Sequence, residues 1–247
     1  PASINFFEFY HNTIKINQSG TIKVPDNQRP YSWDPNEHSE QLITDILEYT
    51  RLSITRIQKV IGDDESVTLD EINECFNEED KLESYFLGTI MVLVDNKVRG
   101  SITEIVDGQQ RLTTFIIFLC VLRDLTNSNF YKGGDKHSNS QLLASNIQRD
   151  FIGKFIGSKY EYYFLPSDNY NNRDSFIEYI LKSNFKEPKK PIPAITKAGE
   201  DLGTNDENNE LFKYINTYDL FYTALEDFSN EIVDNNEGAF KSIKNKH

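Results

Sequence analysis

Cysteine and long apolar runs are both scarce in this sequence of 247 residues. The two cysteines, Cys75 and Cys120, lie far apart and form no metal-ligand pattern, so we expect a reduced, cytoplasmic protein. The longest strongly apolar run, Phe115 to Leu122, is far too short to cross a bilayer, and we expect no membrane partner. We find no secretory signal. Because the chain begins at Pro1 without a methionine, we expect it to be a piece of a longer protein.

Positive charge is scarce as well. The 26 lysines and arginines stand against 39 acidic residues, which gives a formal net charge of −13 at pH 7. The chain as a whole is therefore not a general polyanion binder, and any contact with nucleic acid requires a local basic face or a separate domain. The histidines are scattered, without partners at ligand spacing: His11, His38, His137 and His247. Aromatic residues are abundant, with 17 Phe and 13 Tyr, and predict a folded chain with a sizeable core.

Hydrophobic periodicity predicts an α/β (α+β) fold. In chain order, we expect a short helix early in residues 3–16, a strand at the start of 21–34, an amphipathic helix in 36–60, a solvated acidic insertion at 62–84, and two strands joined by a turn in 85–107. These are followed by a core helix at 109–125, a loop at 126–140, a helix at 141–157 interrupted by Gly153, a strand, turn and helix in 160–181, a polar linker at 186–210 and an amphipathic helix at 211–229. The layout predicts an α/β part over residues 1–125 and a mainly helical part over 126–247.

The sequence IVDGQQRLTTF, residues 105–115, places its polar groups at the start of an otherwise buried helix. The first N–H groups of a helix have no partner within it, and the helix dipole adds partial positive charge, so phosphates bind well there. Gly108 allows a sharp turn and the close approach of a ligand, and Arg111 can hold a phosphate through two hydrogen bonds. Gln109 and Gln110 can donate to oxygens or read the edge of a base or sugar.

Asp107, which precedes this glycine, is open to three roles. Its carboxylate can cap the helix, bind a ribose hydroxyl, or hold a Mg²⁺ ion that bridges phosphates. A simpler interpretation of the whole turn is that Asp107 only caps the helix, while Arg111 pairs with a surface acid.

A second cluster lies in PDNQRPYSWD, residues 25–34. Its members are Gln28, Arg29, Tyr31 and Trp33, which is the single tryptophan. An arginine close to aromatic rings can hold a phosphate and help to stack a base. The alternative is that Tyr31 and Trp33 anchor a loop onto the core.

Together the two clusters resemble the family first catalogued as domain of unknown function 262, the GmrSD-type N-terminal domain. The family pattern is a proline-led QRxYxW, then LGxI, a hairpin, and (I/V)DGQQRLTT at the start of a helix. This chain has PDNQRPYSW at 25–33, FLGTI at 86–90 and IVDGQQRLTTF at 105–115. The eight residues DGQQRLTT are a specific signal, and the motifs cover about the first half of the chain. YFLPSDNYNNRDSFIEYI, at 163–180, resembles a later strand-to-helix segment of the family.

The resemblance implies a ParB/sulfiredoxin-like core in which a glycine-plus-arginine turn before a helix holds nucleotide phosphates. It implies a domain of a modification-dependent restriction or anti-phage protein that binds and hydrolyses a nucleoside triphosphate with Mg²⁺. Such a domain controls a His-Asn-His-type nuclease domain or subunit located elsewhere, and we find no nuclease motif in this sequence. Which nucleotide is bound and whether the chain forms a homo-oligomer are left open.

Site residues follow from the resemblance position by position. The catalytic candidates are Asp107, which is also the metal-ligand candidate, and Arg111. The nucleotide-binding candidates are Gln28, Arg29, Tyr31, Trp33, Gly108, Gln109, Gln110 and Thr113. In this assignment Arg111 stabilises charge on the phosphates and Asp107 orients metal or water. Thr114 also matches the motif, but both threonines are equally compatible with helix packing.

Two other functions stand as alternatives. The first is a non-catalytic sensor that binds modified DNA through basic residues interleaved with aromatic ones: Arg149, Lys154, Lys159 and Arg173 with Phe151, Phe155, Tyr160 and Tyr162. The simpler interpretation places these aromatic rings in the core and leaves the lysines solvated. The second is a direct nuclease, for which the sequence shows no carboxylate cluster suited to two metals. We expect this chain alone to bind duplex DNA weakly.

Overall fold

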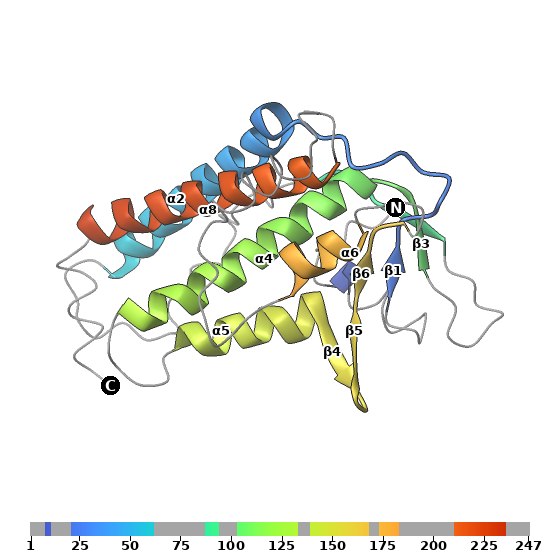
Figure 1. Ribbon diagram of the computed structural model, residues 1–247. Coiled ribbons are helices and arrows are strands. Elements are labelled where there is room, and N and C mark those ends of the chain that lie inside the picture. The colour runs from blue at the N-terminus through green and yellow to red at the C-terminus, as the bar shows by residue number, and fades with distance from the viewer. Residues whose placement is uncertain are drawn as a thin grey trace.

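The computed structural model of the chain describes residues 8–10, 21–61, 87–93, 103–132, 139–167, 173–182 and 210–235 (Figure 1). Residues 8–10 are helical, within the short helix predicted for the start of the chain. The predictions for the acidic insertion at 62–84, the turn within 94–102 and the polar linker over 186–209 lie outside the described residues.

A small mixed sheet lies at one end of the molecule (Figure 1). Its strands are β1 (Ile22–Lys23), β2 (Met91–Leu93), β3 (Thr103–Asp107) and β6 (Phe164–Leu165). They lie in the order β2-β3-β1-β6, with β1 parallel to β3 and to β6, and β2 antiparallel to β3. This sheet together with the helices confirms the predicted α/β (α+β) class. Because β6 lies beyond residue 125, the two parts expected from the sequence contribute to one sheet, and the boundary between them stays a prediction.

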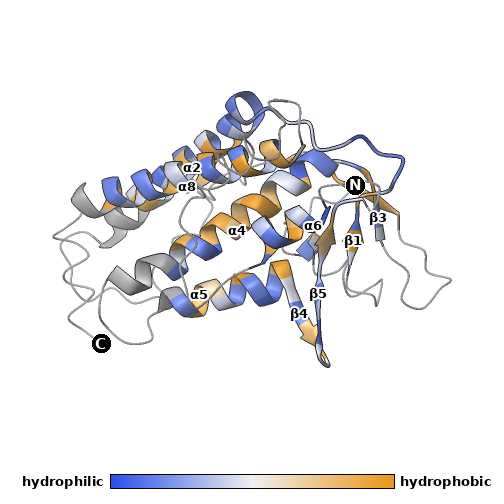
Figure 2. Cartoon of the chain, in the orientation of Figure 1, coloured by the Kyte–Doolittle hydropathy of each residue, from blue (hydrophilic) through white to orange (hydrophobic). Residues whose placement is uncertain are grey.

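Helix α4 (Gln109–Lys132) begins directly after β3 and runs through the core (Figure 2). Most of its side chains between Leu112 and Leu125 are buried in the main hydrophobic cluster. The predicted helix is confirmed, but the predicted loop at 126–140 is wrong at its start, because the helix continues. Asn127 is buried and the Thr126 hydroxyl donates to the Leu122 carbonyl at 2.8 Å. Packing of the buried side chains therefore keeps a turn helical whose composition favours a loop.

Two long helices, α2 (Glu40–Ile61) and α8 (Glu210–Asn235), run side by side, and α8 also packs against α4 (Figure 1). Both agree with the amphipathic helices predicted from the sequence. A short π-helical turn, η1 (Pro35–Ser39), leads into α2, and the Asp34 carboxylate caps it by accepting from the Asn36 N–H at 2.8 Å. Arg51 of α2 donates to Glu231 of α8 at 2.7 Å. Within the described ranges, none of the helices combines the length and apolar character that a membrane crossing requires.

The segment after residue 138 is helical only at first. Its elements are α5 (Asn139–Ile147), the π-helical turn η2 (Gln148–Ile152), β4 (Gly153–Ile156) and β5 (Lys159–Tyr162). The predicted interrupted helix at 141–157 is therefore wrong from Gly153 onward, where an antiparallel hairpin begins. A Cβ atom on Gly153 would lie 2.4 Å from the Glu161 carbonyl oxygen, so the close pairing of the strands requires glycine. Helix α6 (Arg173–Phe176) and the turn η3 (Ile177–Leu181) complete the predicted strand-to-helix segment.

A fully buried arginine, Arg123, and its neighbour Asp124 join four of these elements. The Arg123 guanidinium pairs with the Asp124 carboxylate at 2.8 and 3.0 Å, and it donates to Gln148 of η2 and to the Ile180 and Leu181 carbonyls of η3. All five N–H groups of the side chain are thereby used. Burial by itself lowers the pKa of Arg123, but Asp124 together with Cys120 and Tyr218 outweighs burial, and the net pKa is raised. The Tyr218 hydroxyl of α8 also donates to Asp124, at 2.8 Å.

We predict that Arg123→Leu destabilises the fold by about 3–5 kcal/mol, because it leaves the Asp124 carboxylate buried without its cation. Chemical denaturation of both proteins measures this difference. The matched control is Arg149→Leu, which removes a pair of the same i,i+1 geometry, 2.7 Å to Asp150, from the surface. The control should change the stability little. Equal losses in the two variants would contradict a central role for Arg123.

Candidate functional site

The structure brings the two sequence clusters into direct contact through Gln110. Its side-chain oxygen accepts from the Ser32 N–H at 2.7 Å and from the Trp33 N–H at 3.3 Å. Its side-chain nitrogen donates to the Pro30 carbonyl at 3.0 Å. The buried Gln110 amide therefore bonds the loop as another peptide group would, and fixes residues 30–33 against the first turn of α4.

Two further glutamines hold the same loop. The buried Gln109 side chain donates to the Arg29 carbonyl at 3.0 Å, and Gln28 donates to the Val106 carbonyl of β3 at 3.2 Å. All three glutamine side chains thus bond backbone groups of the opposite cluster. The side chains of Gln109 and Gln110 bond the loop in this structure, whereas the sequence alone suggests that they donate to oxygens of a ligand or read the edge of a base or sugar.

Tyr31 and Trp33 anchor this loop onto the core. Tyr31 is buried, and its ring stacks on Tyr214 of α8 with centroids 4.9 Å apart. Its hydroxyl lies 2.7 Å from that of Thr114 and 3.4 Å from that of Thr217. Burial raises the pKa of Tyr31, so the phenol stays protonated at neutral pH. Trp33 is partly buried against the core, in agreement with the anchoring alternative.

Thr113 and Thr114 belong to the helix itself. Their hydroxyls donate to the carbonyls of Gln109 and Gln110 at 2.8 and 2.9 Å. Thr113 is buried beside a small cavity, and Thr114 lies under Tyr31. Both agree with the packing role that the sequence left open.

Arg111 and Asp107 are the charged groups of the turn that reach solvent. Their side chains are 30% and 55% exposed, and the Arg111 Nη2 atom lies 3.7 Å from an Asp107 oxygen. Gly108 has φ +85°, and a Cβ atom there would lie 2.8 Å from the Thr89 carbonyl oxygen. This glycine therefore makes the turn between β3 and α4 possible.

Gly88 is a further residue of the site, and the sequence alone gives no sign of its role. It has φ +95°, and a Cβ atom on it would lie 2.0 Å from the Arg111 Nη1 atom. The Arg111 guanidinium therefore occupies the space that any other residue at position 88 would fill. The pattern FLGTI contains this glycine, but nothing in the pattern indicates that it faces Arg111.

A small cavity adjoins the first turn of α4 on another side. Its volume, about 10 Å³, is enough for one water molecule. The residues that line it are Val24, Arg29, Tyr31, Gln109, Gln110, Thr113, Pro166 and Tyr214. Arg29 lies next to Gln109, whose side chain donates to the Arg29 carbonyl. Because positions 109 and 111 are about 200° apart around a helix, Arg29 and Arg111 flank the helix start from different sides. A triphosphate would therefore have to lie against Asp107 and the partly exposed Arg111, because the cavity cannot contain it.

Asp107 is the residue of this turn that suits a Mg²⁺ ion. Among the described residues there is no group of three or more His, Cys, Asp or Glu side chains that could hold a metal. A Mg²⁺ ion at Asp107 would take one carboxylate from the protein and its other ligands from phosphate oxygens and water, which is common for this ion.

We predict that Gln110→Ala lowers the free energy of unfolding by about 1–3 kcal/mol, because buried backbone groups of the loop lose their partner. Denaturant titration measures the change. Gln28→Ala is the matched control, since it removes one exposed amide-to-carbonyl bond, to Val106, and should cost distinctly less. A loss for Gln110→Ala no larger than that of the control would show that the loop does not depend on this amide.

Comparison with known proteins places the chain in a family. The family model described as GmrSD restriction endonuclease, N-terminal domain, matches residues 8–245. This range includes both clusters and every element described above. A search of curated proteins finds no match. The chain therefore belongs to the family of GmrSD restriction endonuclease N-terminal domains.

Proposed function

We propose that this domain binds and hydrolyses a nucleoside triphosphate with Mg²⁺, and so controls a nuclease that lies elsewhere in a modification-dependent restriction or anti-phage system. The observation that carries the proposal is the placement of Arg111. It lies in the first turn of α4, its guanidinium rests over Gly88, and it is partly exposed beside Asp107. A cation at the start of a helix, where the first N–H groups have no intrahelical partner, is the arrangement that suits a phosphate.

The roles divide within the motif. Arg111 holds the phosphates and offsets the charge that develops on them during hydrolysis. Asp107 holds Mg²⁺ or orients the attacking water. A bound phosphate would compete with Asp107 for the guanidinium, and their separation of 3.7 Å is longer than a strong charge-assisted hydrogen bond. Arg29, exposed on the other flank of the helix start, supplies a second cation for the nucleotide.

A non-catalytic sensor of modified DNA is the second candidate. The observation in its favour is the exposure of the aromatic and basic hairpin β4–β5, where Phe155 is 72% exposed. The simpler interpretation, in which the aromatic rings of this segment belong to the core, is wrong for Phe155. Tyr160 and Tyr162 are partly buried.

We predict that Arg111→Ala weakens the binding of Mg²⁺-nucleotide by roughly ten- to a hundredfold, because a charge-assisted contact is worth about 1.5–3 kcal/mol. Calorimetric titration of ATP, GTP, CTP and UTP into both proteins measures the effect. Arg149→Ala, at an exposed arginine far from α4's first turn in sequence, is the control and should bind as the wild type does. Absence of binding by the folded wild type, or unchanged binding by Arg111→Ala, would contradict the proposal.

Gly88→Ala tests the placement of Arg111 while keeping its charge. The added methyl group displaces the guanidinium, so nucleotide affinity should fall although Arg111 is present. Gly157→Ala is the matched control for Gly88→Ala. Gly157 also has a positive φ, +63°, but a Cβ atom added there has no other atom within 4 Å. It carries the same kind of backbone strain and should leave the affinity unchanged. An equal effect of both substitutions would mean that strain alone, and not the position of Arg111, governs binding.

A further inference from the structure

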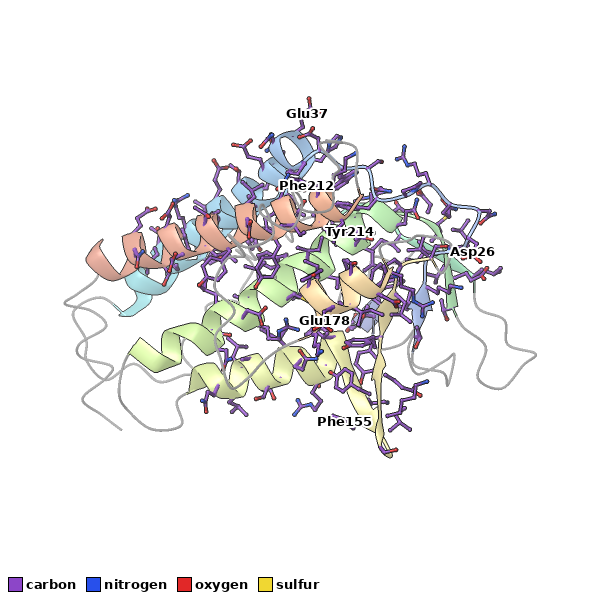
Figure 3. All side chains as sticks on the ribbon, in the orientation of Figure 1. Asp26, Glu37, Phe155, Glu178, Phe212 and Tyr214 are labelled. Atoms are coloured by element: carbon purple, nitrogen blue, oxygen red, sulfur yellow. The ribbon has the colours of Figure 1, made fainter. Side chains whose placement is uncertain are left out.

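The hairpin β4–β5 extends beyond both the helices and the four-stranded sheet (Figure 1). Phe155, labelled in Figure 3, lies on the protruding part and is the most exposed large hydrophobic residue described. Ile156, next to it, is 48% exposed. Phe155 and Ile156 are consecutive strand residues and lie on opposite faces of the ribbon, so apolar surface is exposed on both sides of the protruding tip. This makes the tip a candidate interaction surface.

The charges of the tip indicate what covers it. The six residues KFIGSK, 154–159, hold two exposed lysines and no acid, although the whole chain carries a net charge of −13. Neither Lys154 nor Lys159 has an ion-pair partner among the residues that the structure describes, and Lys154 Nζ lies 5.6 Å from the centre of the Tyr163 ring. The acid closest to them on the hairpin is Glu161, which is paired in register with Lys154 toward the base. The tip is therefore locally cationic in an anionic protein.

The hairpin is fixed to the body of the protein through Tyr160. The Tyr160 hydroxyl accepts a hydrogen bond from Gln148, which itself accepts one from the buried Arg123. Tyr160 meets Phe155 edge to face, with ring centroids 4.9 Å apart. Gly157, at φ +63°, forms the turn. A preorganised ribbon loses little conformational entropy when it binds.

From these observations we propose that β4–β5 is a duplex-DNA contact, a two-stranded ribbon that enters a groove. The major groove is wide enough for such a ribbon. Ile156 shares one face of the ribbon with Lys154 and Lys159, and Phe155 lies on the other face. The two lysines neutralise phosphates at the groove edges, and the two apolar side chains at the tip contact bases from either face, as apolar side chains do in groove-binding proteins. A cationic, apolar tip on a narrow projection fits a grooved polyanion better than a flat protein surface. The contact does not depend on nucleotide binding at Arg111.

The test uses a labelled duplex of about 25 base pairs, which is two to three helical turns. Its binding to the whole chain is measured without nucleotide, over a range of salt concentrations. We expect micromolar binding at low salt. Phe155→Ala/Ile156→Ala should weaken it roughly five- to a hundredfold. Lys154→Ala/Lys159→Ala should weaken it and lower the slope of log affinity against log salt by about two.

Matched controls separate this surface from the rest. Leu142→Ala/Leu143→Ala removes two similarly exposed side chains, 60% and 46%, from α5, and Lys182→Ala removes an exposed lysine of another element. Both should bind the duplex as the wild type does. Three results would overturn the proposal: no duplex binding by the folded wild type, equal effects of hairpin and control variants, or hairpin variants that lose self-association or a protein partner while duplex affinity and salt slope stay unchanged. Because nucleotide is absent throughout, these results are independent of those for Arg111.

Discussion

The amide of Gln110 is the contact on which the candidate site depends, because it satisfies three backbone groups of a loop that has no strand to pair with. It accepts from Ser32 and Trp33 and donates to Pro30, all from within the first turn of α4. A buried backbone group without a partner is costly, so this amide sets where the loop lies. The loop in turn places Arg29 at the helix start and Tyr31 in the core. The two sequence clusters therefore form one structural unit.

This unit is connected to the last described helix. Tyr31 stacks on Tyr214 and its hydroxyl approaches Thr217, both on α8. Further along α4, Arg123 and Asp124 connect the same helix to η2, η3 and Tyr218. One helix thus carries a solvent-exposed charged turn at its start and a buried, fully bonded ion pair in its middle. The buried pair keeps the helix in place, so the position of Arg111 and Asp107 at its start is fixed as well.

The sequence predicts the fold class and the location of the site because both depend on local patterns. The apolar run after Arg111 predicts a core helix, and Gly108 between a strand and that helix predicts a sharp turn. The sequence cannot show that Gln109 and Gln110 bond loop backbone some 80 positions away, because an amide bonds a ligand and a peptide group equally well. The position of Gly88 against Arg111 is likewise a tertiary contact. The hairpin after Gly153 replaces an expected helix because cross-strand packing with Glu161 and Tyr162 outweighs helical propensity.

The central claim is that the glutamines build the site while Arg111 and Asp107 meet the ligand. A crystal structure of the chain with Mg²⁺ and a non-hydrolysable triphosphate tests this division most directly. We expect a phosphate oxygen within hydrogen-bond distance of the Arg111 guanidinium and the ion on Asp107. We also expect that the Gln110 amide still bonds Pro30, Ser32 and Trp33. A nucleotide bound elsewhere, or a Gln110 side chain turned from the loop onto the nucleotide, would contradict the central claim.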